Sequence, residues 1–292
     1  MTLEDGLGDY VTWLDAMGEV EDYFSGAISG LRQGGVVRSR EDVAEPGDGS
    51  LTIVIPVYNE AGNLESIVRY ALAEVEKFID EFEILIVNDG SHDGTGLLAD
   101  NLAAQNPRVR VFHHPFNVGY GGAQKSGFHN ATKKWVVVVP ADHQFDMRDL
   151  AKFLAMRDSA DIIGSYRLDR KDTFARRFIS GLYNWYLQVF HHVGLRDLNW
   201  VKMFRRSILD DIEIENRGFG VDAEIVIKAA ANNRSIVEVP VPHYPRTWGS
   251  PTGINWSNLY KTARELLRIK GMVRQMKAKD VGGPLGGGPD TA

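Results

Sequence analysis

From Leu51 onward, short runs of β-branched and apolar residues alternate with segments whose apolar side chains recur at helical spacing. The pattern predicts strands at 51–58, 83–89, 109–114 and 135–140, and helices at 63–78, 95–105 and about 122–132. Apolar strands separated by helices are typical of an α/β domain in which helices cover both faces of a mostly parallel sheet. Ligands bind such sheets beyond the carboxyl ends of the strands, so we expect the polar loops PVYNE and NDGSHDGT to form a site.

The chain before this pattern has a different character. Apolar residues recur at helical spacing through residues 7–31, and the stretch 33–50 is rich in glycine and acidic residues, as in a linker. Residues 1–48 are therefore predicted to be an N-terminal helical extension and linker, which either packs on the main domain or mediates assembly. The tail at 281–292 is rich in glycine and proline and is predicted to be disordered.

Composition narrows the class of protein. The 292 residues are 43% hydrophobic, enough for one sizeable core with a small appendage. Cysteine is absent, which excludes disulfides and thiolate metal sites and fits a cytoplasmic location. The acidic N-terminus lacks the layout of a signal peptide, and no run approaches the roughly 18 apolar residues of a membrane span. The net charge of −6 argues weakly against nucleic acid as a partner.

Positive charge gathers near the C-terminus. Residues 261–279 hold seven Lys and Arg side chains against a single Glu265: Lys261, Arg264, Arg268, Lys270, Arg274, Lys277 and Lys279. We therefore predict a basic amphipathic helix at 256–280, after a main domain at 49–255. Such a helix suits an anionic membrane surface, although a helix packed on the domain with a solvated basic face fits equally well.

Two motifs follow the first two predicted strands. Pro56, Tyr58 and Glu60 lie where the first strand ends, and a ring and a carboxylate there could contact a base or ribose. A capped helix start with Asn59 as the N-cap explains the same residues. Asp89 directly follows the second strand, and a carboxylate there suits a base N–H or a ribose hydroxyl. Turn and capping chemistry explains the Asp93 and Gly94 that follow, but it does not explain Asp89.

Four segments in order, IPVYNE, VNDGSHDGT, NVGYGGAQKSG and a strand ending in an acidic loop, resemble the family-2 glycosyltransferases with the GT-A fold. More narrowly, they resemble the dolichyl-phosphate mannosyltransferase and polyprenyl-phosphate glycosyltransferase branch. The resemblance covers about residues 50–255. It implies that the donor nucleotide lies among six residues: Pro56, Tyr58, Glu60, Asp89, Gly121 and Lys125.

The chain departs from this family where a metal is expected. The family ends its fourth strand with Asp-x-Asp, which holds Mg²⁺ or Mn²⁺ against the diphosphate. Here Pro140 occupies the first acidic position, Asp142 matches the second, and Gln144 matches a glutamine of the polyprenyl-phosphate branch. Asp142 and Gln144 are the predicted metal ligands, with His143 or Asp146 as further candidates. A metal-independent site that uses Lys or Arg, or a pseudoenzyme, is the alternative.

The resemblance also implies an acceptor site. Arginines followed by a serine match the acceptor-phosphate segment of the branch, which assigns Arg176, Arg177 and Ser180 to the lipid phosphate. A solvated charged turn before a core helix is the alternative. Asp222 matches the family's acidic acceptor-side motif, where it acts as a base toward a hydroxyl acceptor, or positions groups or a metal when the acceptor is a phosphate. It could instead cap a helix at 222–232.

The last motif resembles the family's closing loop, in which an arginine followed by glycine and serine folds over the diphosphate. Arg246 takes that role here, and Pro251 replaces the lysine that often follows. With Asp142 and Asp222, Arg246 completes the predicted catalytic set. The resulting hypothesis is inverting transfer of a hexose from GDP-mannose or a UDP-hexose to a polyprenyl or dolichyl phosphate by a peripheral membrane protein. The alternatives are a soluble or natural-product hydroxyl acceptor and a non-catalytic nucleotide-sugar-binding protein.

Overall fold

The structure is a computed structural model, and it describes residues 49–168, 195–198, 200–216, 218, 220–242 and 244. The predicted extension at 1–48, basic helix at 256–280 and tail at 281–292 lie outside these residues, as do Arg176, Arg177, Ser180 and Arg246. None of the helices in the described part of the chain is both long and apolar enough to cross a membrane.

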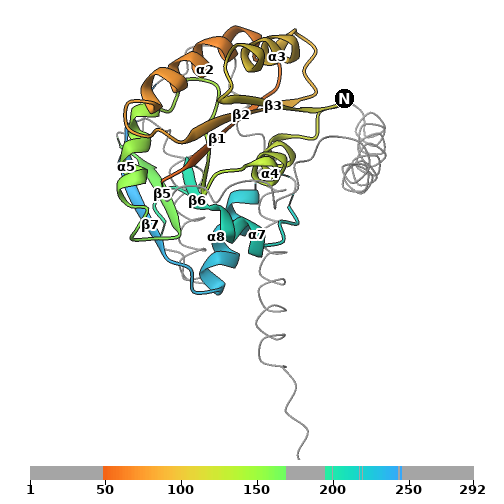
Figure 1. The fold of residues 1–292 in the computed structure, drawn as a ribbon. Helices are drawn as coiled ribbons and strands as arrows, with labels where there is room; N and C mark the ends of the chain where they lie inside the picture. Colours follow the sequence, from red (N-terminus) through yellow and green to blue (C-terminus); the bar gives the residue numbers. More distant parts are fainter. Residues whose placement is uncertain are drawn as a thin grey trace, which may run out of the picture. The chain divides into compact units, whose positions relative to one another are not determined.

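The described chain is an α/β domain built on one seven-stranded sheet (Figure 1). The elements in chain order are β1 (Leu51–Val57), α2 (Ala61–Val75), β2 (Phe82–Asp89), α3 (Thr95–Gln105), β3 (Val109–His114), α4 (Tyr120–Asn130), β4 (Trp135–Val138), η2 (Met147–Asp149), α5 (Leu150–Ala155), β5 (Ile162–Arg167), β6 (Lys202–Arg205), α7 (Arg206–Asp211), α8 (Val221–Ala231) and β7 (Ile236–Val241). The sheet order is β3-β2-β1-β4-β6-β5-β7. This confirms the predicted mostly parallel sheet and its first four strands.

β6 reverses the direction of the sheet locally. It pairs antiparallel with both β4 and β5, whereas β1, β2, β3 and β4 pair in parallel, as do β5 and β7. As a result, the first residue of β6, Lys202, lies at the edge of the sheet where the neighbouring strands have their carboxyl ends. The sequence pattern did not predict this strand, because its four residues, KMFR, have no alternation to detect.

Two apolar layers cover the sheet, as the alternating pattern predicts. One contains the inward faces of α2, α3 and α5, with Leu64, Ile67 and Phe153 fully buried. The other contains α4, α7 and α8, with Ile225 and Ile208 buried against the opposite face. Figure 1 shows α2 and α3 on one side of the strands and α4, α7 and α8 on the other. Burial on both faces explains why the central strands are apolar throughout rather than alternating.

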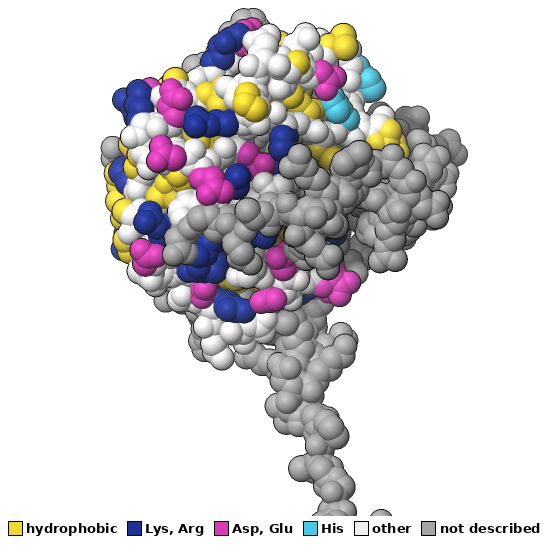
Figure 2. Space-filling view, viewed as in Figure 1, with side chains coloured by type: hydrophobic (Ala, Val, Ile, Leu, Met, Phe, Trp, Pro, Cys, Tyr) yellow, Lys and Arg dark blue, Asp and Glu magenta, His cyan; other side chains and the backbone are white. Residues whose placement is uncertain are grey.

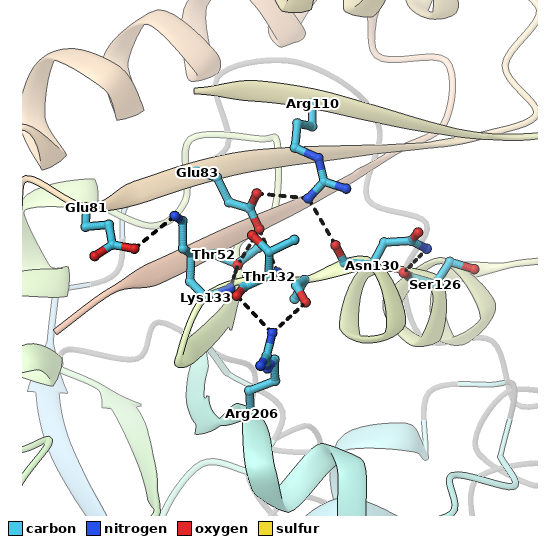
Figure 3. Close-up of polar contacts among 10 residues, drawn as sticks. Thr52, Glu81, Glu83, Arg110, Ser126, Asn130, Thr132, Lys133 and Arg206 are labelled. Atoms are coloured by element: carbon cyan, nitrogen blue, oxygen red, sulfur yellow. Dashed lines mark hydrogen bonds and ion pairs between the residues drawn. The ribbon is translucent and has the colours of Figure 1, made fainter. Parts of the chain in front are cut away.

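A polar cluster ties the strands together at the end of the sheet opposite the carboxyl ends (Figure 3). Glu83, near the start of β2, accepts hydrogen bonds from the Thr52 hydroxyl at 2.7 Å, from the Thr132 amide at 2.8 Å and from Arg110 at 2.9 Å. Burial by itself would raise the pKa of Glu83, but the Thr52 hydrogen bond and the Arg110 charge outweigh it and lower that pKa. Glu83 therefore joins β1, β2, β3 and the turn before β4 as a buried anion.

On the face in Figure 2, acidic and basic side chains are interspersed over the described residues. An even mixture of this kind is typical of an ordinary solvated surface rather than of one that attracts a polyanion. The expectation that nucleic acid is not a partner stays a prediction.

Candidate active site

The carboxyl ends of β1, β2, β4, β5 and β7 meet at one edge of the sheet, and the reversed β6 brings its amino end to the same edge. The loops after β1, β2 and β4 carry the predicted nucleotide and metal residues, and α4 begins close to the end of β3. The site residues that the sequence predicted within the described chain therefore belong to this edge or to α4 and α8. In a parallel sheet, this is where a ligand binds.

The loops after β1 and β2 are locked to each other by hydrogen bonds. The Asn59 amide donates to the Ser91 hydroxyl at 3.0 Å, and the Asn59 side chain accepts from the His92 amide at 2.9 Å. The Glu60 amide donates to the Thr95 hydroxyl at 2.9 Å. Asn59 therefore does not act as the N-cap of α2. Its side chain bridges two loops instead, which fixes Tyr58, 44% exposed, at the edge of the site.

Asp93 continues this connection between the two loops. Its carboxylate accepts from the Thr95 amide at 3.1 Å at the start of α3, but Gly94, and not Asp93, occupies the N-cap position of that helix. Its other oxygen accepts from the Ala61 amide at 3.2 Å at the start of α2. One carboxylate thus satisfies donors at the starts of two helices, and the sequence revealed only the first of these roles.

Asp89 anchors the glycine-rich loop. It is 3% exposed, and it accepts hydrogen bonds from the amides of Val118 and Gly119, both at 2.9 Å. His114 hydrogen-bonds to the same carboxylate at 2.8 Å through Nδ1, and through Nε2 to Ser126 on α4 at 2.8 Å. The predicted contact of Asp89 with the nucleotide therefore stays a prediction. The observed role is to hold the loop before α4 against the end of β2.

Gly90 makes the close approach of this loop possible. Its φ is +67°, and a Cβ placed on it would meet the backbone carbon of Phe116 at 2.4 Å and the backbone nitrogen of Asn117 at 2.6 Å. Gly94 also has a positive φ, of +90°, but a Cβ there would meet nothing within 4 Å. Gly90 is therefore required by contact as well as by conformation, and Gly94 by conformation alone.

α4 carries two further residues that were predicted to lie beside the nucleotide. Gly121 is buried in its first turn, and Lys125 is half-buried. The Lys125 ammonium donates to the backbone carbonyl of Ile214, which precedes α8. Lys125 therefore joins α4 to the acceptor-side half of the domain, and a contact with a nucleotide phosphate stays a prediction.

The loop after β4 holds the predicted metal ligands. Asp142 is buried, and its carboxylate accepts from the Gln144 amide at 3.1 Å in an Asx turn. The other two candidates are engaged elsewhere: His143 hydrogen-bonds to the Ser66 hydroxyl at 2.7 Å, and Asp146 accepts from the Tyr70 hydroxyl at 2.7 Å and pairs with Arg148. The assignment of a cation to Asp142 and Gln144 stays a prediction.

These residues fit a cation that is only partly held by protein. Among the described residues, no three His, Asp or Glu side chains are grouped as a metal cage. Mg²⁺ is commonly bound through one or two carboxylates together with substrate phosphates and water. One buried carboxylate with a neighbouring amide, Asp142 with Gln144, meets that lower requirement and no more.

Asp222, near the start of α8, is held by two donors. Its Oδ1 accepts from Gln124 of α4 at 3.1 Å, and its Oδ2 accepts from Lys202 of β6 at 3.2 Å. Gly220 occupies the N-cap position of α8, and the Asp222 side chain makes no capping bond, so the capping alternative is wrong. Sequence reasoning missed Lys202 and Gln124. A lone lysine opening the short apolar run KMF was the available signal.

The pKa of Tyr120 is sensitive to the charges of the two predicted catalytic carboxylates. It opens α4, and 41% of its surface is exposed. Desolvation of the hydroxyl, followed by the negative charges of Asp222 and Asp142, raises the pKa of Tyr120 above its ordinary value. Because both carboxylates act on one hydroxyl, they lie within electrostatic reach of it. Geometry agrees: Lys202, which pairs with Asp222, opens β6 beside β4, and Asp142 follows β4, although 80 residues separate the two carboxylates in the sequence.

An ion pair joins the residues on either side of the predicted acceptor segment in the sequence. Arg167, the last residue of β5, pairs with Asp197 at 2.7 Å, and both side chains are largely buried. The guanidinium also stacks on the Trp200 ring, 4.7 Å from its centroid.

The chain just before Arg246 contacts the loop after β4. The Tyr244 amide, two positions before Arg246, donates to the Gln144 carbonyl at 3.4 Å. Tyr244 therefore contacts the loop that holds Asp142 and Gln144, while Arg246 itself lies outside the described residues.

Comparison with known proteins agrees with this geometry. The profile described as Glycosyl transferase family 2 matches residues 52–213, more than half of the chain. The polyprenol monophosphomannose synthase of Mycolicibacterium smegmatis is 32% identical over 211 residues, covering 68% of this chain and 78% of that protein. The undecaprenyl-phosphate mannosyltransferase of Micrococcus luteus is 30% identical over 208 residues, covering 67% and 84%.

Solved structures show the same fold at lower identity. The glucosyl-3-phosphoglycerate synthase of Mycobacterium tuberculosis superposes with a TM-score of 0.60 at 18% identity, over 76% of this chain and 80% of that one. This likeness confirms the predicted GT-A architecture. The order of the motifs, the shared edge of the sheet and the extent of the sequence match lead to one conclusion: the chain belongs to glycosyl transferase family 2 and is a glycosyltransferase.

Proposed function

We propose that this glycosyltransferase moves a hexose, with inversion, from GDP-mannose or a UDP-hexose to a polyprenyl phosphate. The observation that carries the proposal is the similarity, over two thirds of the chain, to two proteins named for mannose transfer to polyprenol or undecaprenyl phosphate. The arrangement of the site supports it, because loops that fit a nucleotide and the acceptor-side Asp222 face one region of the sheet edge.

On the donor side, the proposal gives each loop a separate task. Tyr58, exposed at the edge, offers a ring for the base; Pro56 lies near the end of β1, and Glu60 follows in the loop. Asp89 keeps the loop before α4 in place, and the backbone amides at the start of a helix suit a diphosphate. Gly121 and Lys125 follow on that helix. Arg246 would neutralise charge on the leaving diphosphate.

A divalent cation, Mg²⁺ or Mn²⁺, would be held by Asp142 and Gln144. When bound, it would neutralise charge on the leaving diphosphate as a Lewis acid. The similar synthase from Mycobacterium tuberculosis was solved with Mn²⁺ and UDP-glucose, which supports a divalent cation in this reaction. Because Pro140 supplies no carboxylate, we expect the cation to depend on the donor's own phosphates more than a cation held by Asp-x-Asp does.

On the acceptor side, a phosphate is the acceptor that suits the surroundings of Asp222. A phosphate is already anionic, so attack on the anomeric carbon requires no proton to be removed. Asp222 has both carboxylate oxygens engaged by donors, as befits a group that orients rather than one that collects a proton. The acceptor phosphate itself is assigned to Arg176, Arg177 and Ser180 through the fork of donors that arginine provides.

The acceptor also determines where the protein works. A polyprenyl phosphate lies in a membrane, and nucleotide sugars are soluble, so the site must meet a membrane surface. We propose peripheral attachment on the cytoplasmic face through the basic segment at 256–280. Flotation of the purified chain with vesicles of anionic and of neutral lipid tests this directly, and equal binding to both would contradict it.

The function is tested by transfer itself. The purified chain, incubated with labelled GDP-mannose, UDP-glucose or other UDP-hexoses, Mn²⁺ and undecaprenyl phosphate in detergent, is expected to move label into the organic phase. The Arg176→Ala, Arg177→Ala double variant should lose this transfer but retain hydrolysis of the donor. Label that reaches only soluble hydroxyl acceptors would favour the hydroxyl alternative. Donor binding without any turnover would favour a non-catalytic protein, the possibility that Pro140 raises.

A further inference from the structure

A buried lysine lies at the functional edge of the sheet. The Lys202 side chain is 1% exposed, and its ammonium donates to the Trp200 carbonyl at 2.7 Å and to Asp222 at 3.2 Å. Burying an ammonium group is costly unless it is paired and hydrogen-bonded. Both requirements are met here, and they are met by the carboxylate that the family motif assigns to the acceptor side.

The pair fixes both ends of the Asp222 carboxylate. Lys202 holds Oδ2, while Gln124, which is 1% exposed, holds Oδ1. The Asp222 side chain remains 17% exposed, so a ligand can reach it, while the two buried donors fix its orientation. A carboxylate held by two donors on different elements has little freedom to rotate away.

The same contacts connect the donor and acceptor halves of the domain. Gln124 belongs to α4, whose first turn follows the loop that Asp89 anchors, and Asp222 belongs to α8. Lys202 enters from β6, which reaches this edge because it runs antiparallel to its neighbours. The contacts among Gln124, Asp222 and Lys202 therefore set the acceptor-side carboxylate relative to the nucleotide loop.

We infer that Lys202 is a positioning residue for the transfer reaction, acting through Asp222 together with Gln124. The inference rests on the proposed function, because it assigns Asp222 to the reacting groups. Misplacing a group in the reaction by about 1 Å can lower the rate by about 100-fold without weakening the binding of the donor. Loss of Lys202 should therefore lower kcat and leave the KM for the nucleotide sugar nearly unchanged.

The test compares two buried lysines. Lys202→Met is expected to lower kcat for transfer about 10- to 100-fold with a change in donor KM of less than about threefold. Lys202→Arg, which keeps the charge and the donors, is expected to recover most of kcat. The matched control is Lys228→Met, because Lys228 is also buried, 4% exposed, and pairs with Glu224 on α8. Lys228→Met should lower the Tm without lowering kcat per folded molecule.

Three outcomes would overturn the inference. One is a folded Lys202→Met protein with wild-type kcat, and another is a loss of kcat no larger than in Lys228→Met at equal Tm. If Lys202→Met does not fold, Gln124→Met removes the other donor without stranding a charge, and an unchanged kcat in that variant is the third. Failure of the proposed function looks different, because the wild-type chain would then transfer no sugar to undecaprenyl phosphate.

Discussion

Gly90 and Gly94 bracket a five-residue turn, and only one of them is pressed against neighbouring backbone. We expect Gly90→Ala to destabilise the protein by more than the roughly 1–2 kcal/mol of a left-handed conformation, because its Cβ would also push Phe116 and Asn117 away. Gly94→Ala should show the conformational cost alone. Urea unfolding measures both, and donor binding should weaken only in Gly90→Ala. Equal losses of stability in the two variants would contradict the close approach.

Pro140 is the residue that most separates this site from an Asp-x-Asp site. Pro140→Asp adds a carboxylate two residues before Asp142, and ligand charge is a main determinant of cation affinity. We expect the Mn²⁺ concentration that gives half-maximal transfer to fall about tenfold in this variant. Pro140→Ala, which removes the ring and adds no charge, should leave that concentration unchanged. The same response from both variants would mean that the cation does not lie near this position.

Asp89 and Lys202 show which features of single residues the sequence could predict and which it could not. The motifs identified Asp89 as a carboxylate with a special position, and the structure confirms that it is buried at the end of β2. Its bonds to the amides of Val118 and Gly119 could not be predicted, because they join segments that are 29 and 30 residues apart. Lys202 was missed for a related reason: its partner Asp222 becomes a neighbour only through the sheet.

At the scale of elements, Glu83 on β2 accepts hydrogen bonds from β1, from β3 and from the turn before β4 (Figure 3). Its pKa is lowered in the folded chain, so its contribution to the free energy of unfolding is fully present above the ordinary carboxyl pKa of about 4.3 and is lost as the pH falls through the lowered value. Glu83→Gln should cost about 1–3 kcal/mol at pH 7, since charged hydrogen bonds are lost.

The pH dependence separates this effect from a general loss of packing. The difference in the free energy of unfolding between wild type and Glu83→Gln should shrink as the pH falls below the ordinary carboxyl pKa of about 4.3 and through the lowered pKa of Glu83. Thr52→Val is a suitable companion, because it removes one donor and leaves the charge in place. A difference that stays constant from pH 7 to pH 3 would show that the charge of Glu83 does not matter.

Elements differ in how well the sequence predicts them. The long amphipathic helices and the four apolar parallel strands were predicted within a few residues, because burial on one or both faces leaves a periodic signal. β5, β6 and β7 were not predicted: β6 has four residues, and β7 contains Pro240 in an edge strand. Strands whose pairing depends on distant partners leave little local trace, and one of them, β6, supplies the Lys202 that pairs with Asp222.

At the scale of the whole molecule, a ligand that binds only the folded chain raises its stability. A saturating nucleotide at about 100 times its Kd should add about 2.7 kcal/mol and raise the Tm. We expect such a shift with either GDP or UDP but not with both, since one base fits the loops around Tyr58 and Asp89. Thermal shift assays with GDP, UDP and dTDP measure it. Similar shifts with all three would mean that the phosphates, and not the base, dominate recognition.

The reversal of β6 has a consequence for the evolution and engineering of this domain. The chain leaves the sheet at Arg167, the end of β5, and re-enters it at Lys202, which pairs with Gly164 of β5, so the intervening segment begins and ends at adjacent strands. A segment with neighbouring ends can be lengthened, shortened or replaced at small cost to the rest of the sheet. We therefore expect that exchanging residues 169–194 between relatives transfers the choice of acceptor. The preference for the donor nucleotide should stay that of the protein that receives the segment.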